Sequence, residues 1–215
     1  VLVSILTSCD TNMAADRVID DHTAAEAVYP SKPRRILLFS GKRKSGKDYI
    51  TNALQERIGH DSGVIIRLSG PIKYQWAKSE GLDFDELLSD GKYKENHRLR
   101  MAKWGENVRK EDYGYFCRAA IEMYKTHNKP IWIVSDTRRK SDIQWFTDNF
   151  GDICKTIRIV SDDSIRNKRG WVFTPGIDDA ETECDLDDFS PWDLIVTNNN
   201  GDMNTIFQDI LKLEL

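Results

Sequence analysis

The segment that most constrains the fold of this chain is Gly41-Lys42-Arg43-Lys44-Ser45-Gly46-Lys47-Asp48. An apolar run, Ile36–Phe39, precedes it, and a segment with helical periodicity that stops near Gly59 follows it. A glycine, four residues and then Gly-Lys, between a strand and a helix, is the spacing of a phosphate-binding loop. Its glycines let backbone N–H groups face phosphate oxygens, and the lysine and the helix dipole add positive charge. A glycine-containing turn in a solvated basic loop is the alternative that the bare pattern leaves open.

One position departs from this pattern. Loops of this kind usually carry Ser or Thr after Gly-Lys to hold magnesium, and this chain has Asp48 there. A carboxylate suits magnesium either directly or through a bound water molecule. Asp48 is therefore the candidate metal ligand, by either route.

Strands alternate with helices along the rest of the chain. Apolar runs predict five strands, at 35–39, 64–68, 131–134, 156–160 and 194–196. The turn Ser69-Gly70-Pro71 is expected to end the second strand. Helices are expected at 49–58, over most of 72–127 with breaks at three glycines, at 141–150 and at the end of the chain. This order predicts an α/β fold, a three-layer parallel β-sheet of about five strands flanked by helices, with ligands at the carboxyl ends of the strands.

The domain organisation follows from the same pattern. Residues 1–33 show no periodicity and end at Pro30 and Pro33, so we interpret them as a flexible N-terminal extension. Residues 34–215 are expected to form a single domain. The arginine-rich segment around 161–176 is expected to be a small lid that closes over a bound nucleotide.

Charge is unevenly distributed. The net charge is −4, yet the stretch 32–47 contains seven basic residues and no acidic ones. Acidic residues gather instead at Asp178, Asp179, Glu181, Glu183, Asp185, Asp187 and Asp188. A short basic cluster on an acidic protein favours a small polyanionic ligand over a nucleic acid. A nucleotide switch or nucleic-acid binder that uses the 32–47 stretch is the alternative of a different class.

The cysteines and the start of the chain bear on its location. Cys9, Cys117, Cys154 and Cys184 are widely spaced, which favours reduced thiols over a disulfide framework or a zinc site. The opening apolar run is too short to span a membrane and does not resemble a secretory signal. We therefore expect a cytoplasmic protein that acts without a membrane or nucleic-acid partner, as a monomer.

Three basic clusters need explanation: the loop, the Arg138-Arg139 pair and the segment 166–169. One phosphate loop serves one nucleotide, so the remaining cations imply a second anion, as phosphoryl transfer requires. Arg138 and Arg139 follow a strand, where they would clamp a phosphorylated acceptor. Asp136, directly before them, would either help hold magnesium or cap the next helix. Taken singly, the Arg138-Arg139 pair and the segment 166–169 would be interpreted as solvated surface charge; together with the loop they favour function.

Five separated stretches resemble the animal-type phosphomevalonate kinase family, in the right order. They are Leu37–Asp48, Arg67-Leu68-Ser69-Gly70-Pro71, Ser135-Asp136-Thr137-Arg138-Arg139, Ser141-Asp142-Ile143-Gln144-Trp145 and Arg169–Gly176. The unusual Asp48 belongs to that family's pattern. The resemblance runs from about Arg35 to the end of the chain and implies a P-loop fold like that of the nucleoside monophosphate kinases.

The resemblance also implies the activity and the residues that serve it. The reaction is transfer of the γ-phosphoryl group of ATP, with magnesium, to the phosphate of 5-phosphomevalonate, in isoprenoid and sterol synthesis. A kinase of the same fold for another phosphorylated small acceptor, such as a nucleoside monophosphate, is the alternative. By similarity, ATP is bound by Gly41, Lys42, Arg43, Lys44, Ser45, Gly46, Lys47, Asp48, Arg169 and Asn199. The acceptor is bound by Lys44, Arg109, Arg118, Arg138, Arg139 and Asn198. Catalysis is assigned to Lys44, Lys47, Arg138 and Arg139.

Overall fold

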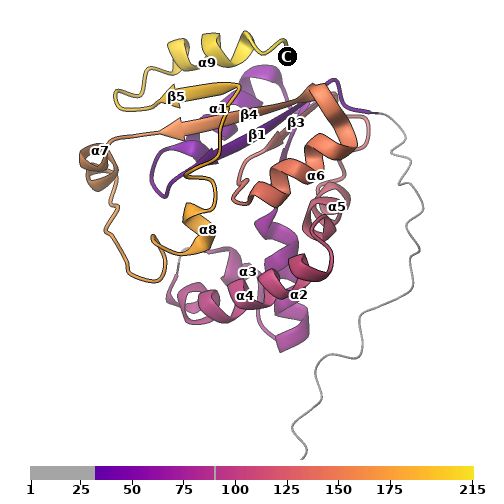
Figure 1. The fold of residues 1–215 in the computed structure, drawn as a ribbon, viewed down its shortest axis with the longest axis vertical. Helices are drawn as coiled ribbons and strands as arrows, with labels where there is room; N and C mark the ends of the chain where they lie inside the picture. Colours follow the sequence, from indigo (N-terminus) through magenta and orange to yellow (C-terminus); the bar gives the residue numbers. More distant parts are fainter. Residues whose placement is uncertain (1–31, 90) are drawn as a thin grey trace, which may run out of the picture.

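A five-stranded parallel sheet forms the centre of the computed structural model, which describes residues 32–89 and 91–215. The expected N-terminal extension, 1–33, lies outside the described residues except for its last two. The strands are β1 (Arg35–Gly41), β2 (Gly63–Ile66), β3 (Ile131–Val134), β4 (Cys154–Val160) and β5 (Leu194–Thr197). Their order across the sheet is β2-β3-β1-β4-β5 (Figure 1). The predicted α/β fold, with about five parallel strands, is confirmed.

Alternating side chains of β1 explain the three layers. Ile36 and Leu38 pack in one apolar cluster with α5 (Tyr115–Met123) and α6 (Lys140–Phe150). Leu37 and Phe39 face the other side, in a cluster with α1 (Lys47–Ile58) and α9 (Met203–Leu211). Because helices cover both faces, a central strand is apolar at every position, as this run is.

A helical unit is attached between β2 and α5. It consists of α2 (Ser69–Glu80), α3 (Phe84–Leu88) and α4 (Lys92–Glu111), and it has a small core of its own around Trp76, Leu87 and Met101. The predicted glycine breaks are confirmed. Gly81 ends α2 with a left-handed φ of 65°, and Gly91 and Gly114 directly precede α4 and α5.

The prediction of a turn at Ser69-Gly70-Pro71 is wrong. These three residues form the first turn of α2. Proline is tolerated there, because the first N–H groups of a helix have no partner within it. The side chain of Asp136, 67 residues away, accepts hydrogen bonds from the backbone N–H groups of Leu68 and Ser69. The signal that starts this helix is therefore a long-range contact.

Three short elements complete the chain. They are the 3-10 turn Gly151–Ile153, α7 (Asp163–Lys168) and α8 (Glu181–Cys184). Figure 1 places α8 between the carboxyl edge of the sheet and the helical unit. Within 32–89 and 91–215, no helix has the length and apolar character needed to cross a bilayer.

The strand order determines where chemistry can occur. The segment 42–46 follows β1, the segment 135–139 follows β3 on one side, and residue 161 follows β4 on the other. Since all strands are parallel, these segments meet at one edge of the sheet. Every candidate site segment that follows a strand is thus brought to the same place.

We expect Leu38→Ala to lower the free energy of unfolding by about 2–5 kcal/mol, because the side chain is fully buried between the sheet and α6. Ile195→Ala is the control, since Ile195 is 58% exposed on β5. Urea unfolding followed by circular dichroism measures both. Equal losses for the two variants would contradict the described packing.

Candidate active site

The phosphate-loop conformation depends on Gly41, Lys44 and Gly46. A Cβ atom on Gly41 would lie 2.7 Å from the Ile159 carbonyl oxygen of the adjacent strand, so only glycine fits. Lys44 and Gly46 have left-handed φ values of 61° and 92°. Gly46 precedes α1, and no side chain caps the start of this helix. The first backbone N–H groups of α1 are therefore available to an anion.

Lys47 is buried beneath the loop. Its ammonium donates to the Ser135 carbonyl oxygen at 2.6 Å and to Asp48 Oδ1 at 2.8 Å. Burial lowers the pKa of Lys47 below its ordinary value, and the Arg138 guanidinium acts in the same direction while Asp48 opposes both. Lys47 thus holds its position with few partners, as a phosphate ligand needs.

Asp48 lies at the mouth of the loop, with its side chain 73% exposed. Desolvation acts to raise the pKa of its carboxyl group, but the Lys47 ammonium together with Arg67 and Arg138 holds the pKa below its ordinary value. An ionised, accessible carboxylate beside the loop has the chemistry of a magnesium ligand. Among the described residues, no group of three or more His, Cys, Asp or Glu side chains forms a ready-made metal site.

Asp136 caps a helix. Its Oδ1 accepts from the Leu68 N–H at 2.6 Å and its Oδ2 from the Ser69 N–H at 3.1 Å. Both oxygens are therefore used at the start of α2. Of the two roles predicted for Asp136, capping is the one that this geometry favours, although the helix is α2 rather than the next one in sequence.

Arg138 and Arg139 diverge from the end of β3. Arg138 Nη1 donates to the carboxylate of Glu183 and, at 3.4 Å, to the carbonyl oxygen of Thr182. Arg139 is 4% exposed, and its Nε and Nη2 both donate to Glu106 Oε1 of α4. Its Nη1 makes no hydrogen bond and lies 3.7 Å from Glu181 Oε1, in an ion pair. Arg138 is thus anchored by one carboxylate and Arg139 by two, and each guanidinium keeps N–H donors that make no hydrogen bond.

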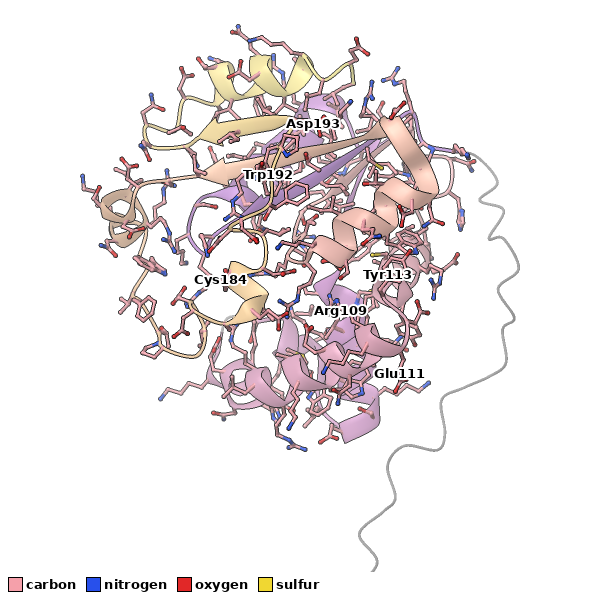
Figure 2. All side chains as sticks on the ribbon, in the orientation of Figure 1. Arg109, Glu111, Tyr113, Cys184, Trp192 and Asp193 are labelled. Carbon is pink, nitrogen blue, oxygen red and sulfur yellow. The ribbon has the colours of Figure 1, made fainter. Side chains whose placement is uncertain are left out.

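A buried carboxylate, Asp142, supports this loop. Its Oδ2 accepts from the backbone N–H groups of Arg138 and Arg139, and its Oδ1 lies 3.6 Å from Arg109 Nε. Burial raises the pKa of Asp142, an effect that Arg109 opposes. Arg109 lies where α4 approaches the start of α6 (Figure 2). Arg109 is therefore brought to the same cluster as Arg138 and Arg139.

Arg118 and Asn199 are placed differently from that cluster. Arg118, in α5, forms an ion pair with Asp112, whereas Arg138 and Arg139 pair with Glu183 and Glu106. Asn199 Oδ1 accepts from the Asp162 N–H at 2.9 Å, directly before α7. Both stay predictions as ligand-binding residues.

Asn198 and Arg169 donate hydrogen bonds to the backbone of the phosphate loop. Asn198 is 3% exposed, and its Nδ2 donates to the Ser45 carbonyl oxygen at 2.8 Å. Arg169 Nη1 donates to the same oxygen at 3.0 Å, and its Nη2 donates to the Asn198 carbonyl oxygen at 2.9 Å. A side chain larger than hydrogen at Gly46 would collide with Asn198. Arg169, which follows α7, and Asn198, which follows β5, thus hold the loop in this conformation.

The sequence reasoning missed the carboxylates that face these cations. Lys42 pairs with Asp187 at 2.5 Å, Arg43 with Asp178 at 2.8 Å, and Arg138 with Glu183. Lys42 also lies 3.4 Å from the sulfur of Cys184, which Figure 2 labels in α8. The acidic stretch was visible in the sequence, but its contact with the basic clusters depends on how α8 folds back.

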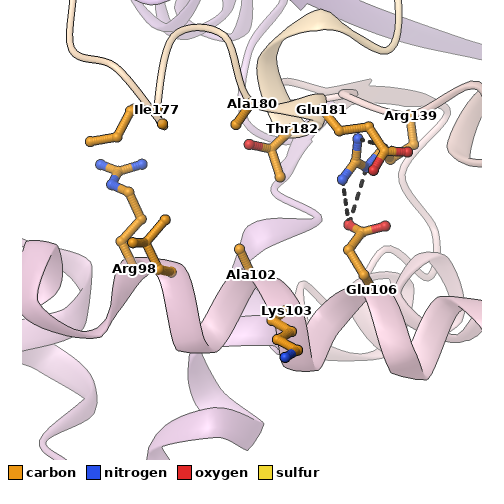
Figure 3. Close-up of a pocket in the computed structure, with 11 residues that line it drawn as sticks. Arg98, Ala102, Lys103, Glu106, Arg139, Ile177, Ala180, Glu181 and Thr182 are labelled. Atoms are coloured by element: carbon orange, nitrogen blue, oxygen red, sulfur yellow. Dashed lines mark hydrogen bonds and ion pairs between the residues drawn. The ribbon is translucent and has the colours of Figure 1, made fainter.

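A cavity of about 170 Å³ opens between α4 and the segment 176–182. Arg139 and Glu106 lie at one end of it and Arg98 at the other, as Figure 3 shows. Leu99 and Ile177 contribute apolar walls. A wider hollow of about 560 Å³ continues from Arg98 to Arg43 of the phosphate loop. This arrangement can hold a small anionic molecule against the loop.

This chain is similar in sequence to known phosphomevalonate kinases. The phosphomevalonate kinase family model matches residues 39–152. A curated phosphomevalonate kinase from Drosophila melanogaster is 48% identical over 179 residues, which cover 82% of this chain and 94% of that protein.

Two solved structures are similar at low sequence identity. TT1252 from Thermus thermophilus has a TM-score of 0.52 at 13% identity, with 86% of this chain and 100% of that chain covered. A gluconokinase from Sinorhizobium meliloti has a TM-score of 0.48 at 15% identity, with 84% and 91% covered. The first likeness supports the fold alone.

We expect Asp136→Asn to lower the free energy of unfolding by about 0.5–2 kcal/mol, because an amide nitrogen replaces one of the two oxygens that cap α2. Asp61→Asn is the matched control, since Asp61 is an exposed residue in the turn before β2. Urea unfolding without ligands measures both. If Asp136→Asn left stability unchanged and altered only the magnesium dependence of turnover, the capping role would be wrong.

Proposed function

The chain belongs to the phosphomevalonate kinase family, and from this premise we propose that it transfers the γ-phosphoryl group of ATP to 5-phosphomevalonate. The products are ADP and 5-diphosphomevalonate, in the mevalonate pathway of isoprenoid and sterol synthesis. The observation that carries the proposal is a phosphate loop whose neighbouring strand end bears two arginines, Arg138 and Arg139, with donors to spare.

ATP binds at the loop Gly41–Asp48. Its phosphates meet the uncapped N-terminus of α1 and the ammonium of Lys47. Lys42, Arg43, Lys44, Ser45 and Gly46 surround them, and Arg169 and Asn199 complete the nucleotide site. The residues 161–176 act as a lid that excludes water, so that ATP is not hydrolysed in place of transfer.

The acceptor binds against Lys44, Arg109, Arg118, Arg138, Arg139 and Asn198. The cavity between α4 and 176–182 supports this assignment, because it has an arginine at each end and apolar walls between them. A carboxylate holds each arginine there, Glu106 for Arg139 and Glu95 for Arg98. Arg138 lies near Lys47 and the phosphate loop, where its charge lowers the pKa of Lys47. The phosphoryl group must pass through this region on its way from ATP to the acceptor.

The chemistry needs positioning rather than a base. An oxygen of the acceptor phosphate, already ionised at neutral pH, attacks the γ-phosphorus and forms a new P–O bond. The bond from the γ-phosphorus to the bridging oxygen breaks, and ADP leaves with the electron pair. Lys44, Lys47, Arg138 and Arg139 hold the reacting oxygens in line and neutralise the charge that develops on them.

Magnesium is the cation that such a site would take. When bound it supplies further neutralisation of the phosphate charge. Asp48 fits its requirements, since it is an ionised and accessible carboxylate beside the loop, and it would hold the ion directly or through water.

The proposal extends to the domain organisation, oligomeric state, location and partners of the protein. Residues 34–215 act as one domain with the lid at 161–176. The protein acts as a monomer in the cytosol, on small molecules alone, without a nucleic-acid or membrane partner. The short extent of the basic surface at the loop supports the preference for small anions.

We expect Lys47→Met to lower kcat by about 10²- to 10³-fold, which corresponds to the loss of one preorganised donor. Lys212→Met is the matched control, because Lys212 is exposed, follows α9 and pairs with Asp209 on the surface. A coupled ADP-release assay measures both. Full activity of Lys47→Met would contradict the role assigned to Lys47.

A panel of acceptors tests the substrate. We expect ADP release with 5-phosphomevalonate to exceed release with nucleoside monophosphates by at least about 10²-fold, since a site that pairs polar substrate groups rejects molecules that leave them unpaired. The assay uses MgATP and each acceptor in turn. Preference for a nucleoside monophosphate would overturn the proposed substrate while keeping the fold and the loop.

A further inference from the structure

The acidic segment Asp178–Asp188 folds over the basic site. Seven of its eleven residues are carboxylates. Figure 1 places its helix, α8, between the carboxyl edge of the sheet and the helical unit. Most of these carboxylates contact a cation of the loops after β1 and β3, and the three pairs of interest are Asp178–Arg43, Glu183–Arg138 and Asp187–Lys42. A segment of this composition would otherwise be expected in solvent.

Glu183 is the most buried of these partners. Its side chain is 4% exposed, whereas the side chain of Arg138 is 38% exposed. Arg138 Nη1 donates to the Glu183 carboxylate and to the Thr182 carbonyl oxygen. Among the residues that the structure describes, no acceptor bonds Nε or Nη2 of Arg138. Glu183 therefore occupies one edge of the guanidinium and leaves the rest open.

The same arrangement recurs at the loop. Asp178 has a side chain that is 5% exposed, and its Oδ2 accepts from Arg43 Nη1 and from the Thr174 N–H, both at 2.8 Å. Asp187 uses Oδ2 for Lys42 at 2.5 Å and Oδ1 for Arg158 at 2.8 Å. Each carboxylate is itself fixed by a second donor, so each is a rigid counter-charge rather than a loose surface group.

Burial of Glu183 and Asp178 makes their two ion pairs hard to separate. Removing the partner of a buried charge leaves that charge uncompensated, which is costly. A guanidinium has five N–H donors, so it can keep a carboxylate on one edge and bind phosphate oxygens with the others. Charge compensation and phosphate binding are therefore compatible at Arg138.

We propose that Glu183 is a positioning residue for phosphoryl transfer, because it holds Arg138 in place before the substrates arrive. Asp178 and Asp187 perform the same task for Arg43 and Lys42. The proposal deepens the function above and rests on it, since it concerns how the same cations meet two phosphorylated substrates. The opposite role, in which these carboxylates compete with phosphate for the cations, is an outcome of the test.

The test compares Glu183→Gln with Asp179→Asn. Both remove one negative charge from the same segment, but Asp179 accepts from the Gly176 N–H and forms no ion pair with a described residue. We expect Glu183→Gln to lower kcat by about 10- to 100-fold, as loss of a group that orients a reacting residue does. Asp179→Asn should keep the wild-type kcat and KM.

Two results of the coupled ADP assay would overturn the proposal. One is a kcat for Glu183→Gln equal to that of Asp179→Asn. The other is a lower KM for either substrate with kcat unchanged, because that is the mark of a carboxylate that competes with phosphate. If wild type itself released no ADP with 5-phosphomevalonate, the proposed function would fall instead.

Two further measurements keep the test independent of folding. Acetate should restore part of the activity of Glu183→Ala, relative to chloride at equal ionic strength, since acetate matches the group removed; a purely structural role predicts no such rescue. If the Glu183 variants do not fold, Asp187→Asn replaces them, because its side chain is 44% exposed. It should raise KM for ATP while leaving the thermal midpoint near wild type, and an unchanged or lowered KM would count against the proposal.

Discussion

Compensation of fixed positive charge is the constraint on which this site depends. A protein that binds two phosphorylated molecules must gather cations at one place, and those cations repel one another before the ligands arrive. Here each of the central cations has a carboxylate partner: Glu106 for Arg139, Glu183 for Arg138, Asp187 for Lys42 and Asp178 for Arg43. The partners come from α4 and from the acidic segment, so the helical unit, α8 and the sheet are joined through the site itself.

The sheet topology makes this possible. With β1 between β3 and β4, the phosphate loop is flanked by the arginine-bearing loop on one side and by the segment that begins at residue 161 on the other. The loop conformation is held from beneath by Asn198 and Arg169, which both donate to the Ser45 carbonyl oxygen. The site is therefore rigid at the loop and supported from four strands, which is what catalysis by positioning requires.

Much of this could be predicted from the sequence because the signals are local. The glycine-lysine spacing and the apolar run before it predicted β1, the loop and α1, and the other four strands were found with small errors at their ends. The missed features all depend on distant contacts. The start of α2 needs the side chain of Asp136, and the carboxylate partners of the arginines come from α4 and α8, up to 45 residues away from Arg138. The sequence shows that a segment is acidic, but only the folded structure shows which cations its carboxylates contact.

The measurement that tests this account most directly is a crystal structure with 5-phosphomevalonate, magnesium and a non-hydrolysable ATP analogue. The account predicts phosphate oxygens on Lys47 and on Nε or Nη2 of Arg138, while Glu183 still accepts from Nη1. Arg139 should meet the acceptor through Nη1, which makes no hydrogen bond here and lies 3.7 Å from Glu181. A complex in which Glu183 has left Arg138, or in which both arginines face away from the two phosphorylated molecules, would contradict it.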